Sequence, residues 1–266
     1  MQRRIDTGFS FPEKGQVINM FNAEKEIINI TNWIKVWFEE NGPKANAVIG
    51  LSGGKDSSIV AALLVKALGT DRVKGVMMPN GVQKDISDSE RIAAHLGIKT
   101  YTVNIAPIYD ASLNTLEEST DDIEMSKDTR INLAPRIRMS VLYAIAQSLP
   151  QGGRVANTCN ASEDYIGYST KYGDAAGDFS PCSDFTVTEM LEIGDKLNLP
   201  EGLVHKTPSD GLCGQTDEEK IGFTYALLDR FIRTGECEDE EIRKKIERMH
   251  ALNLHKLKVI PSYRRE

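Results

Sequence analysis

The chain has 266 residues, of which 40% are hydrophobic, and it carries a formal net charge of −7. This length and composition suit one α/β domain with a substantial core, or at most two small domains. The acidic balance argues against nucleic acid as the main partner, because phosphate binding needs a broad basic face. We find no apolar stretch near the ~20 residues of a membrane span and no apolar signal-peptide core. We therefore expect a soluble, cytoplasmic protein with no nucleic acid or membrane partner and with reduced cysteines.

Apolar spacing predicts strands that alternate with helices in the first half of the chain. Residues 1–20 are expected to form an extended arm, and isoleucines at three- and four-residue steps predict an amphipathic helix over 21–41. Short apolar runs predict strands at 46–51, 72–78 and 99–105. Helical spacing predicts helices at 57–68 and 86–97.

The second half of the chain has longer polar segments. Residues 110–128 are rich in Ser, Thr, Asp and Glu, which predicts a mobile surface segment. A long helix is expected from about 130 to 149, where Pro135 is tolerated only in the first turn. A fourth strand is expected at 154–159, before a polar loop over 160–185. Helices are then predicted near 186–197, 217–235 and 239–251, followed by a short tail.

The alternation of strands and helices predicts the fold class. It indicates a doubly wound α/β domain with a mainly parallel sheet of about five strands, covered by helices on both faces. The chain shows no internal repeat and no Pro/Gly/Ser-rich linker, so we expect a single domain over 1–266. Sheets of this kind bind ligands at the carboxyl ends of their strands.

The segment from Ser52 to Ser58, SGGKDSS, lies between the first predicted strand and the helix that follows it. Its glycines permit positive φ and leave backbone N–H groups accessible, which favours anion binding at the helix start. The segment is not a Walker A motif, because Asp56 stands where that motif needs Ser or Thr. An aspartate beside a phosphate needs a cation between them, so Asp56 predicts Mg²⁺. The alternative is an ordinary turn with Asp56 as the helix N-cap.

The SGGKDSS segment resembles the signature of the ATP pyrophosphatase, or PP-loop, class, which has an adenine nucleotide alpha hydrolase-like fold. Three further stretches, at 132–139, 157–181 and 206–229, resemble motifs of NAD synthetases in the same order, and His255-Lys256 resembles a pair near the end of that family. The resemblance implies a ligase of NAD biosynthesis that forms a C–N bond. Such a ligase uses ATP to convert deamido-NAD to NAD through a NAD-adenylate, takes ammonia as the nitrogen donor, and releases AMP and pyrophosphate.

The same resemblance implies roles for individual residues. It implies that Asp56 and Glu163 are catalytic and bind Mg²⁺. The ATP contacts that it implies are Gly50, Leu51, Ser52, Gly53, Gly54, Lys55, Asp56, Ser57, Ser58, Gln83, Thr158 and Ser209. The deamido-NAD contacts that it implies are Arg136, Tyr168, Lys171, Asp174, Asp178, His255 and Lys256. Arg138 is expected to be structural.

Four positions depart from the family pattern. Val187 stands where many members have a lysine that reaches the ATP phosphates, and Lys196 or Lys206 could replace that charge. The other departures are Met77 for an arginine, Pro135 for an alanine and Asn157 for a glycine.

The resemblance also implies an assembly. The family forms homodimers, and Trp33 and Trp37 on the 21–41 helix suit either a dimer interface or the core. Residues 1–45 are too few for a glutaminase domain, so ammonia is expected to come free or from a partner chain. The segments 110–128 and 203–216 are candidate lids.

Two other functions remain open at this point. Another PP-loop adenylating ligase, such as a tRNA-modifying enzyme, would need a basic face or reactive cysteines, and neither is visible in the sequence. A non-catalytic nucleotide-binding module would keep the fold without the chemistry, and Val187 and Asn157 are the hints toward it.

Overall fold

The computed structural model describes residues 21–83, 86–205, 216–258, 260–263 and 265. Its strands are β1 (Asn46–Gly50), β2 (Val73–Met77), β3 (Lys99–Thr102) and β4 (Gly153–Val155). They form one parallel sheet in the order β3-β2-β1-β4. The described residues thus form four strands rather than about five. Beyond β4 the chain makes only an isolated bridge between Ala156 and Phe179, which is too short for a strand.

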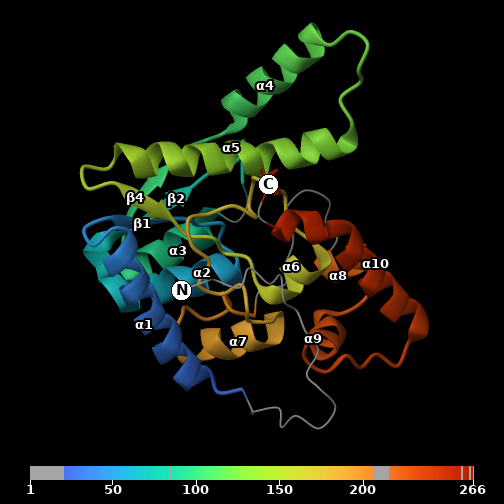
Figure 1. Cartoon of the computed structure of the whole chain (residues 1–266). Helices are drawn as coiled ribbons and strands as arrows, with labels where there is room; N and C mark the ends of the chain where they lie inside the picture. The colour runs from blue at the N-terminus through green and yellow to red at the C-terminus, as the bar shows by residue number, and fades with distance from the viewer. Residues whose placement is uncertain (1–20, 84–85, 206–215, 259, 264, 266) are drawn as a thin grey trace.

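Helices cover both faces of the sheet, as a doubly wound fold requires (Figure 1). One face carries α1 (Ala23–Asn41), α2 (Lys55–Leu68), α3 (Ile86–Leu96) and α7 (Val187–Lys196), and the short 3₁₀ turn Thr70–Arg72 precedes β2. The opposite face carries α5 (Lys127–Ser148), with α4 (Ala106–Ser119) on its outer side. The predicted doubly wound α/β class is confirmed.

The sheet face beneath α1 and α2 holds the largest core cluster. Ile34 and Phe38 of α1 and Ile59, Leu63 and Leu64 of α2 are all less than 2% exposed. Burying one such side chain contributes roughly 1.5–3 kcal/mol. Because α2 lies among β1, β2, α1 and α7, it is apolar on most of its surface. This packing fixes the position of the helix that follows the SGGKDSS turn.

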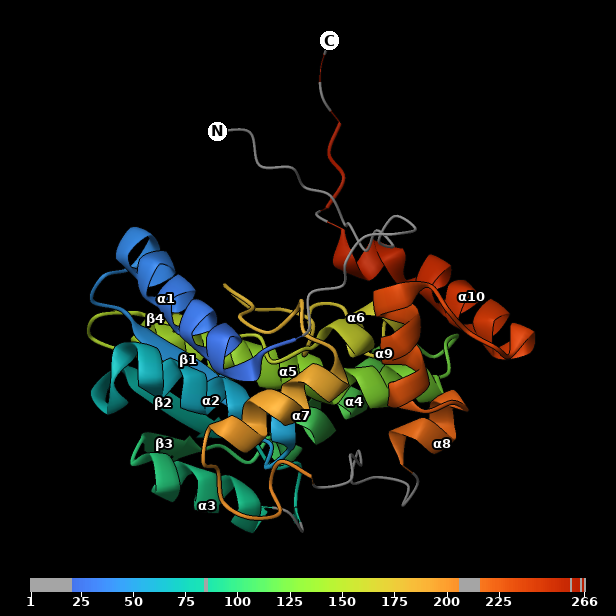
Figure 2. The ribbon, with the colours of Figure 1, turned by 90° about the horizontal axis from the view of Figure 1, so that it is seen from below.

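The C-terminal part of the chain forms a second helical layer beside the sheet (Figure 2). It comprises α6 (Ala161–Ile166), α8 (Asp217–Ile221), α9 (Tyr225–Thr234) and α10 (Glu240–Leu257), which share their own apolar cluster. The helix expected over 217–235 is therefore two helices, because Gly222 at φ 80° ends α8. The expected loop 160–185 contains α6. The expected tail pair, His255 and Lys256, lies in the last turn of α10.

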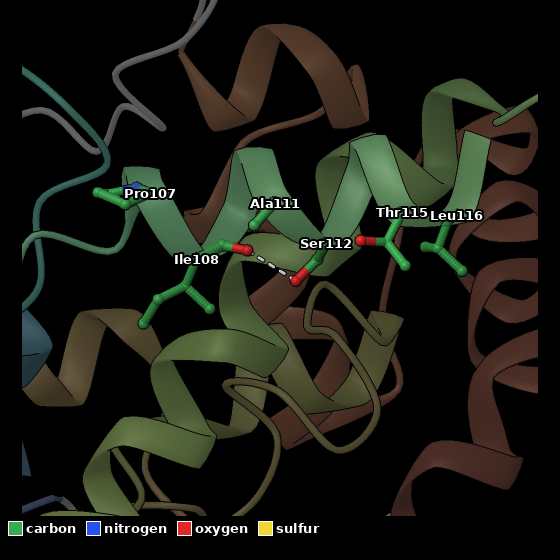
Figure 3. A pocket seen from close by; sticks show the side chains of 6 residues that line it. All are labelled: Pro107, Ile108, Ala111, Ser112, Thr115 and Leu116. Atoms are coloured by element: carbon green, nitrogen blue, oxygen red, sulfur yellow. Dashed lines mark hydrogen bonds between the residues drawn. The ribbon is translucent and has the colours of Figure 1, made fainter. Parts of the chain in front are cut away.

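The acidic segment at 110–128 does not match its prediction as a mobile stretch, because most of it belongs to α4 and α5. Leu113 of α4 is 7% exposed, and the hydroxyl of Tyr109 donates to the Arg130 carbonyl oxygen at 2.9 Å. These contacts tie α4 to α5. Figure 3 shows a hollow along α4 lined by Pro107, Ile108, Ala111, Ser112, Thr115 and Leu116. None of these is a predicted site residue.

Pro135 lies inside α5, and the expectation that it must sit in the first turn was wrong. The helix begins earlier than expected because Ser126 caps it, with the Ser126 hydroxyl accepting from the Thr129 amide at 3.1 Å. Proline lacks the N–H that the Ile131 carbonyl would accept. Ile131 is 46% exposed, so water can reach that part of the helix.

None of the described helices is long and apolar enough to cross a membrane.

Candidate active site

The order of the strands creates a ligand position at the carboxyl end of the sheet. β1 pairs with β2 on one side and with β4 on the other, so the winding of the sheet reverses between β1 and β4. Open α/β sheets bind ligands at such a reversal, outside the carboxyl ends of the strands. The chain leaves β1 into the SGGKDSS turn and α2, and it leaves β4 into residues 157–160 and α6.

The SGGKDSS turn has the backbone form of the predicted anion cradle at the start of α2. Gly53 has φ 80°, and Gly54 is the N-cap without a side-chain capping bond. The hydroxyl of Ser52 accepts from the Gly54 amide at 3.2 Å, and the hydroxyls of Ser57 and Ser58 donate to the Gly54 carbonyl oxygen at 3.2 and 2.8 Å. The amides that precede Ser58 therefore lie at the positive end of the helix dipole, where anions bind.

Asp56 does not cap the helix, which removes the ordinary-turn alternative. It is the second residue of α2, and its carboxylate Oδ2 accepts from Lys55 Nζ at 2.8 Å. Lys55 is only 6% exposed. Burial lowers the pKa of Lys55, but the charges of Asp56 and Glu163 outweigh it and raise the pKa above the usual value. Lys55 is thus a charged partner of the acidic pair.

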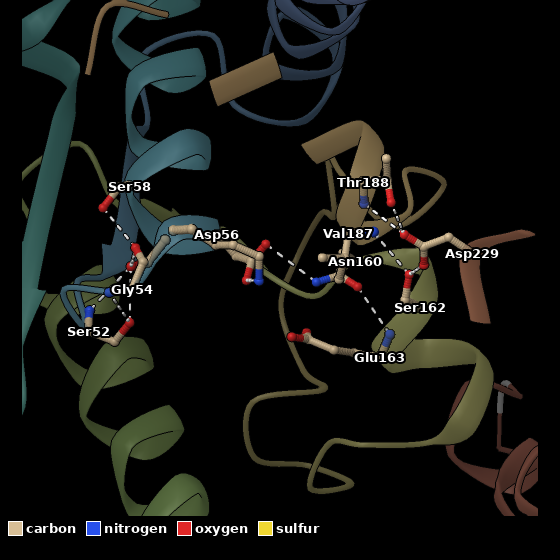
Figure 4. A network of polar contacts seen from close by, with 12 residues as sticks. Ser52, Gly54, Asp56, Ser58, Asn160, Ser162, Glu163, Val187, Thr188 and Asp229 are labelled. Carbon is tan, nitrogen blue, oxygen red and sulfur yellow. Dashed lines mark hydrogen bonds and ion pairs between the residues drawn. The ribbon is translucent and has the colours of Figure 1, made fainter. Parts of the chain in front are cut away.

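Asn160 links the carboxylate of Asp56 to the backbone of Glu163. Its Nδ2 donates to Asp56 Oδ1 at 3.3 Å, and its Oδ1 accepts from the Glu163 amide at 3.0 Å, which caps α6 (Figure 4). Asn160 is fully buried. Burial first, and then the charge of Asp56, raise the pKa of Glu163 to about 8. Burial, which disfavours the charged form of the carboxyl group, is the larger of these two causes.

This pair suits a magnesium ion. Mg²⁺ prefers hard oxygen ligands, and in nucleotide sites it takes one or two carboxylates and completes its shell with phosphate oxygens and water. Asp56 and Glu163 supply two such carboxylates, and a divalent cation would relieve their mutual repulsion. The described residues contain no group of three or more acidic, His or Cys side chains able to hold a metal. A role in binding Mg²⁺ stays a prediction for both residues.

The remaining predicted ATP residues lie around the cradle or outside the described chain. Gln83 Nε2 donates to the Ser52 carbonyl oxygen at 3.5 Å, which places Gln83 against the turn. Gly50 ends β1, and the Leu51 side chain is 3% exposed in the core, so only its backbone can face a ligand. Thr158 is half-buried in the segment after β4. Ser209 lies outside the described residues.

The predicted substrate residues gather between α5, α10 and the loop after α6. Arg136 Nε donates to the Lys171 carbonyl oxygen at 3.3 Å, and Lys171 Nζ donates to the His255 carbonyl oxygen at 2.8 Å. The ammonium of Lys256 donates to two carbonyl oxygens of the same loop, at 2.7 and 2.9 Å. The hydroxyl of Tyr168 donates to Asp217 Oδ1 at 3.0 Å. These side chains therefore shape the loop in this structure.

Asp174 and Asp178 also hold the loop in place. Asp174 Oδ1 accepts from the Thr170 amide at 2.8 Å. Asp178 accepts from the Val155 amide at 2.7 Å and from the Tyr143 hydroxyl at 3.2 Å. Burial first, and then Asp178, raise the pKa of Tyr143 to about 12. Deamido-NAD binding by these two aspartates stays a prediction.

Asn157 explains one departure from the family pattern. Its Nδ2 donates to the carbonyl oxygens of Asp174 and Ala176 at 2.8 and 3.1 Å, and its Oδ1 accepts from the Cys159 amide and the Ser180 hydroxyl at 2.8 and 3.0 Å. A glycine could make none of these contacts.

Arg138 is structural, as expected: its Nε donates to the Met78 carbonyl oxygen at 3.1 Å, and burial lowers its pKa.

Lys196 does not replace the family lysine at Val187. The Val187 side chain is 6% exposed within the C-terminal apolar cluster. Lys196 lies at the other end of α7, about 13 Å away at 1.5 Å per residue, and pairs on the surface with Glu24 at 2.9 Å. The suggestion that Lys196 substitutes was wrong, and Lys206 lies outside the described residues.

Sequence reasoning missed a buried network beside α6. The hydroxyl of Ser162 donates to Asp229 Oδ1 at 2.5 Å, and Asp229 Oδ2 accepts from the Thr188 amide and hydroxyl at 2.7 and 2.6 Å (Figure 4). Asn160 was missed as well. The spacing of Asn160 and Glu163 is that of an N-cap and the third helical residue, and this signal could have revealed α6.

Comparisons with known proteins identify the family of the chain. The family model described as NAD synthase matches residues 26–266. The NH(3)-dependent NAD(+) synthetase of Pyrococcus furiosus is 40% identical over 212 residues, covering 79% of this chain and 78% of that protein. The enzyme of the same name from Carboxydothermus hydrogenoformans is 38% identical over 243 residues, covering 90% and 96%.

Solved structures show the same likeness. The NMN synthetase of Francisella tularensis superposes with a TM-score of 0.83 at 32% identity, over 91% of this chain and 99% of that one. The NH3-dependent NAD synthetase of Campylobacter jejuni, solved with a nitrate ion, gives 0.75 at 26% identity, over 92% and 100%. These matches do not favour another PP-loop ligase, such as a tRNA-modifying enzyme. The chain belongs to the NAD synthase family.

Proposed function

We propose that this protein converts deamido-NAD to NAD by ATP-dependent amidation, with ammonia as the nitrogen donor. Family membership and the ammonia-dependent relatives support the reaction. The observation that carries it is the position of Asp56 and Glu163 next to the anion cradle at the start of α2. Asn160 links them by bonding the Asp56 carboxylate and the Glu163 backbone amide. This arrangement suits a magnesium-bound triphosphate.

The reaction has two steps. A carboxylate oxygen on the pyridine ring attacks the α-phosphorus of ATP, which forms a P–O bond and releases pyrophosphate. Ammonia then attacks the carbonyl carbon, AMP leaves with the bonding electrons, and the nitrogen loses a proton to give the amide of NAD. Activation is needed because oxide is a very poor leaving group and AMP is a good one.

The chain's own residues bind and orient these reactants. The amides that precede Ser58 and the α2 dipole hold the departing pyrophosphate, where negative charge accumulates. Asp56 and Glu163 would hold Mg²⁺, which would neutralise charge on the phosphate oxygens. Lys55 keeps Asp56 oriented. Arg136, Lys171 and Lys256 order the loop that the dinucleotide contacts.

Incubation with deamido-NAD, ATP, Mg²⁺ and ammonium tests the proposal. We expect NAD, AMP and pyrophosphate in equal amounts, and no product with Asp56→Ala at the same protein concentration. Pyrophosphate release that depends on a tRNA instead of deamido-NAD would show a different ligase. No pyrophosphate with any acid would show a nucleotide-binding module without the chemistry.

A second substrate deserves a parallel assay. The Francisella tularensis structure, which carries the name NMN synthetase, matches with a TM-score of 0.83. Nicotinate mononucleotide has the same pyridine carboxylate as deamido-NAD, so the same two steps would amidate it. The curated relatives favour the dinucleotide. The ratio of kcat/KM for the two acids, measured with one protein preparation, decides between them.

We further propose a cytoplasmic homodimer. The three described cysteines are free thiols, as in a reducing compartment. On α1, Ile28, Trp33 and Val36 are 59%, 45% and 53% exposed, which is a large apolar area for a helix surface. A second copy of the chain could cover these side chains. Sedimentation velocity of the full chain measures the oligomeric state.

A further inference from the structure

Asn160 makes two hydrogen bonds, one to each of the residues predicted to bind the metal, Asp56 and Glu163. Its Oδ1 caps α6 through the Glu163 amide at 3.0 Å, and its Nδ2 donates to Asp56 Oδ1 at 3.3 Å. The side chain is fully buried, so water does not compete for either bond. Asp56 follows β1 and Glu163 follows β4, so Asn160 links residues that are far apart in the sequence.

The Asp56 carboxylate is held from both sides. Lys55 Nζ donates to Oδ2 at 2.8 Å while Asn160 Nδ2 donates to Oδ1. The contact from Asn160 differs from the contact from Lys55, because only Asn160 also accepts a hydrogen bond from the backbone amide of Glu163. Outer partners of metal-binding carboxylates commonly set their orientation in this way.

Asn160 itself stands on a fixed support. The next hydroxyl in α6, that of Ser162, donates to the buried Asp229 and accepts from the Val187 amide at 3.0 Å. This joins the first turn of α6 to α7 and α9 (Figure 4). The side-chain amide of Asn160 therefore has little freedom to move away from the Asp56 carboxylate.

We propose that Asn160 is a positioning residue that orients the Asp56 carboxylate and holds it at the distance from the Glu163 backbone that a divalent cation between the two side chains requires. This inference rests on the proposed function, since that function assigns the metal to the same two carboxylates. Asn160 touches neither ATP nor the reacting atoms in this scheme. Its contribution passes through the two carboxylates.

Serine at position 160 separates the bridge from the helix cap. Serine caps helices about as well as asparagine, so Asn160→Ser keeps a hydroxyl for the Glu163 amide. The hydroxyl takes the place of Oδ1, and nothing takes the place of Nδ2. Asn22 offers a matched control, because its Oδ1 caps α1 by accepting from the Lys25 amide at 2.9 Å, at the opening of a helix remote from the pair.

The test measures Mn²⁺ binding by electron paramagnetic resonance, with α,β-methylene-ATP present, for the wild-type, Asn160→Ser and Asn22→Ser proteins. We expect Asn160→Ser to weaken Mn²⁺ binding by ~10–100-fold, the usual effect of removing such a partner. Asn22→Ser should bind Mn²⁺ as the wild type does. In the full reaction, kcat should fall for Asn160→Ser while KM for deamido-NAD stays near the wild-type value.

Unchanged Mn²⁺ affinity in Asn160→Ser would overturn the proposal and leave Asn160 as a helix cap. If Asn160→Ser fails to fold, Asn160→Thr provides the same comparison with a second capping hydroxyl. A wild-type protein that binds Mn²⁺ but makes no NAD would remove the proposed reaction, while the affinity comparison would still decide the role of Asn160. A wild type without Mn²⁺ binding would overturn both.

Discussion

At the scale of single residues, the site is a balance of buried charges. Lys55 carries one positive charge against the carboxylates of Asp56 and Glu163, and burial together with the Asp56 charge raises the pKa of Glu163 despite that lysine. Replacing one partner of a buried charged group costs more than the pair contributes when intact. The position of the Asp56 carboxylate therefore depends on its hydrogen bonds to Lys55 and Asn160.

Asp229 is a residue whose loss should be felt in stability. Asp229→Leu removes the acceptor for the Ser162 hydroxyl and for two donors of Thr188. Leaving the buried Ser162 hydroxyl without its acceptor costs about 1–3 kcal/mol, so the free energy of unfolding in urea should fall by about that amount. Asp195→Ala provides the control, because Asp195 only pairs with His205 on the surface, at 2.8 Å. Equal effects of the two substitutions would contradict the structural role of Asp229.

At the scale of elements, α6 depends on α10. The rings of His250 and Tyr165 stack with their centroids 4.0 Å apart, and His250 Nδ1 lies 2.8 Å from the Tyr165 carbonyl oxygen. Asn253 Nδ2 donates to the next carbonyl oxygen, that of Ile166, at 3.1 Å, and Lys256 donates to the one after, that of Gly167. One row of α10 side chains thus satisfies successive carbonyl groups at the end of α6.

Gly167 is the closest point between these two helices. It has φ 67°, and a Cβ there would lie 2.1 Å from Asn253 Cβ. Gly167→Ala should therefore cost ~1–2 kcal/mol for the left-handed backbone and roughly 1–3 kcal/mol more for the clash. Gly202→Ala isolates the backbone cost, since Gly202 has φ 79° with nothing within 4 Å of its Cβ position. Equal unfolding free energies for the two variants would contradict this contact.

Pro135 gives the opposite expectation. It interrupts the hydrogen bonds of α5, and a proline in a helix interior costs ~3 kcal/mol relative to alanine. Pro135→Ala should raise the free energy of unfolding, by less than that amount because alanine leaves the unfolded chain freer than proline does. Alanine also keeps the Cβ that lies beside Gly173. The measurement is urea unfolding at equilibrium, and a destabilised variant would contradict this expectation.

The sequence predicted the elements with regular apolar spacing and missed those held by side-chain contacts. The strands at 46–51 and 72–78 were found because they are buried on both faces and read as short apolar runs, and the helices around them because their apolar residues recur at helical spacing. α4 was missed because its acidic surface hides the buried Leu113. α6 is too short for a periodic signal and exists because Asn160 caps it and α10 covers its end.

The predicted site shows the same division. The SGGKDSS turn and the pairing of Asp56 with Glu163 followed from motifs at strand ends. The resemblance gave no sign that Lys256, Asp174 and Asp178 would engage the backbone of the substrate loop, because those contacts depend on how the loop folds. The network of Ser162 and Asp229 joins residues 67 positions apart and has no local sequence signal.

At the scale of the whole molecule, two apolar clusters sandwich the sheet and a third joins the C-terminal helices to it. The candidate site lies where the sheet meets the C-terminal layer: the cradle belongs to α2, and Glu163 belongs to α6. Movement of one layer against the other would change the distance between Asp56 and Glu163. Asn160 opposes that movement.

The proposed dimer makes a prediction at this scale. Trp33 is 45% exposed, whereas Trp37 stacks on Phe179 with ring centroids 4.6 Å apart. Trp33→Glu should therefore give a folded monomer in sedimentation velocity, because charge at an exposed position opposes association without opening the core. Trp37→Glu should lower the melting temperature instead. A Trp33→Glu protein that remains dimeric would place the interface elsewhere.

The most direct test of the account is a crystal structure of the protein with α,β-methylene-ATP, deamido-NAD and Mn²⁺. The anomalous signal of manganese locates the metal independently of the protein coordinates. The account predicts a peak coordinated by the carboxylates of Asp56 and Glu163, with the β- and γ-phosphates against the amides that precede Ser58. A metal bound away from both carboxylates, or a triphosphate that does not touch this turn, would contradict it.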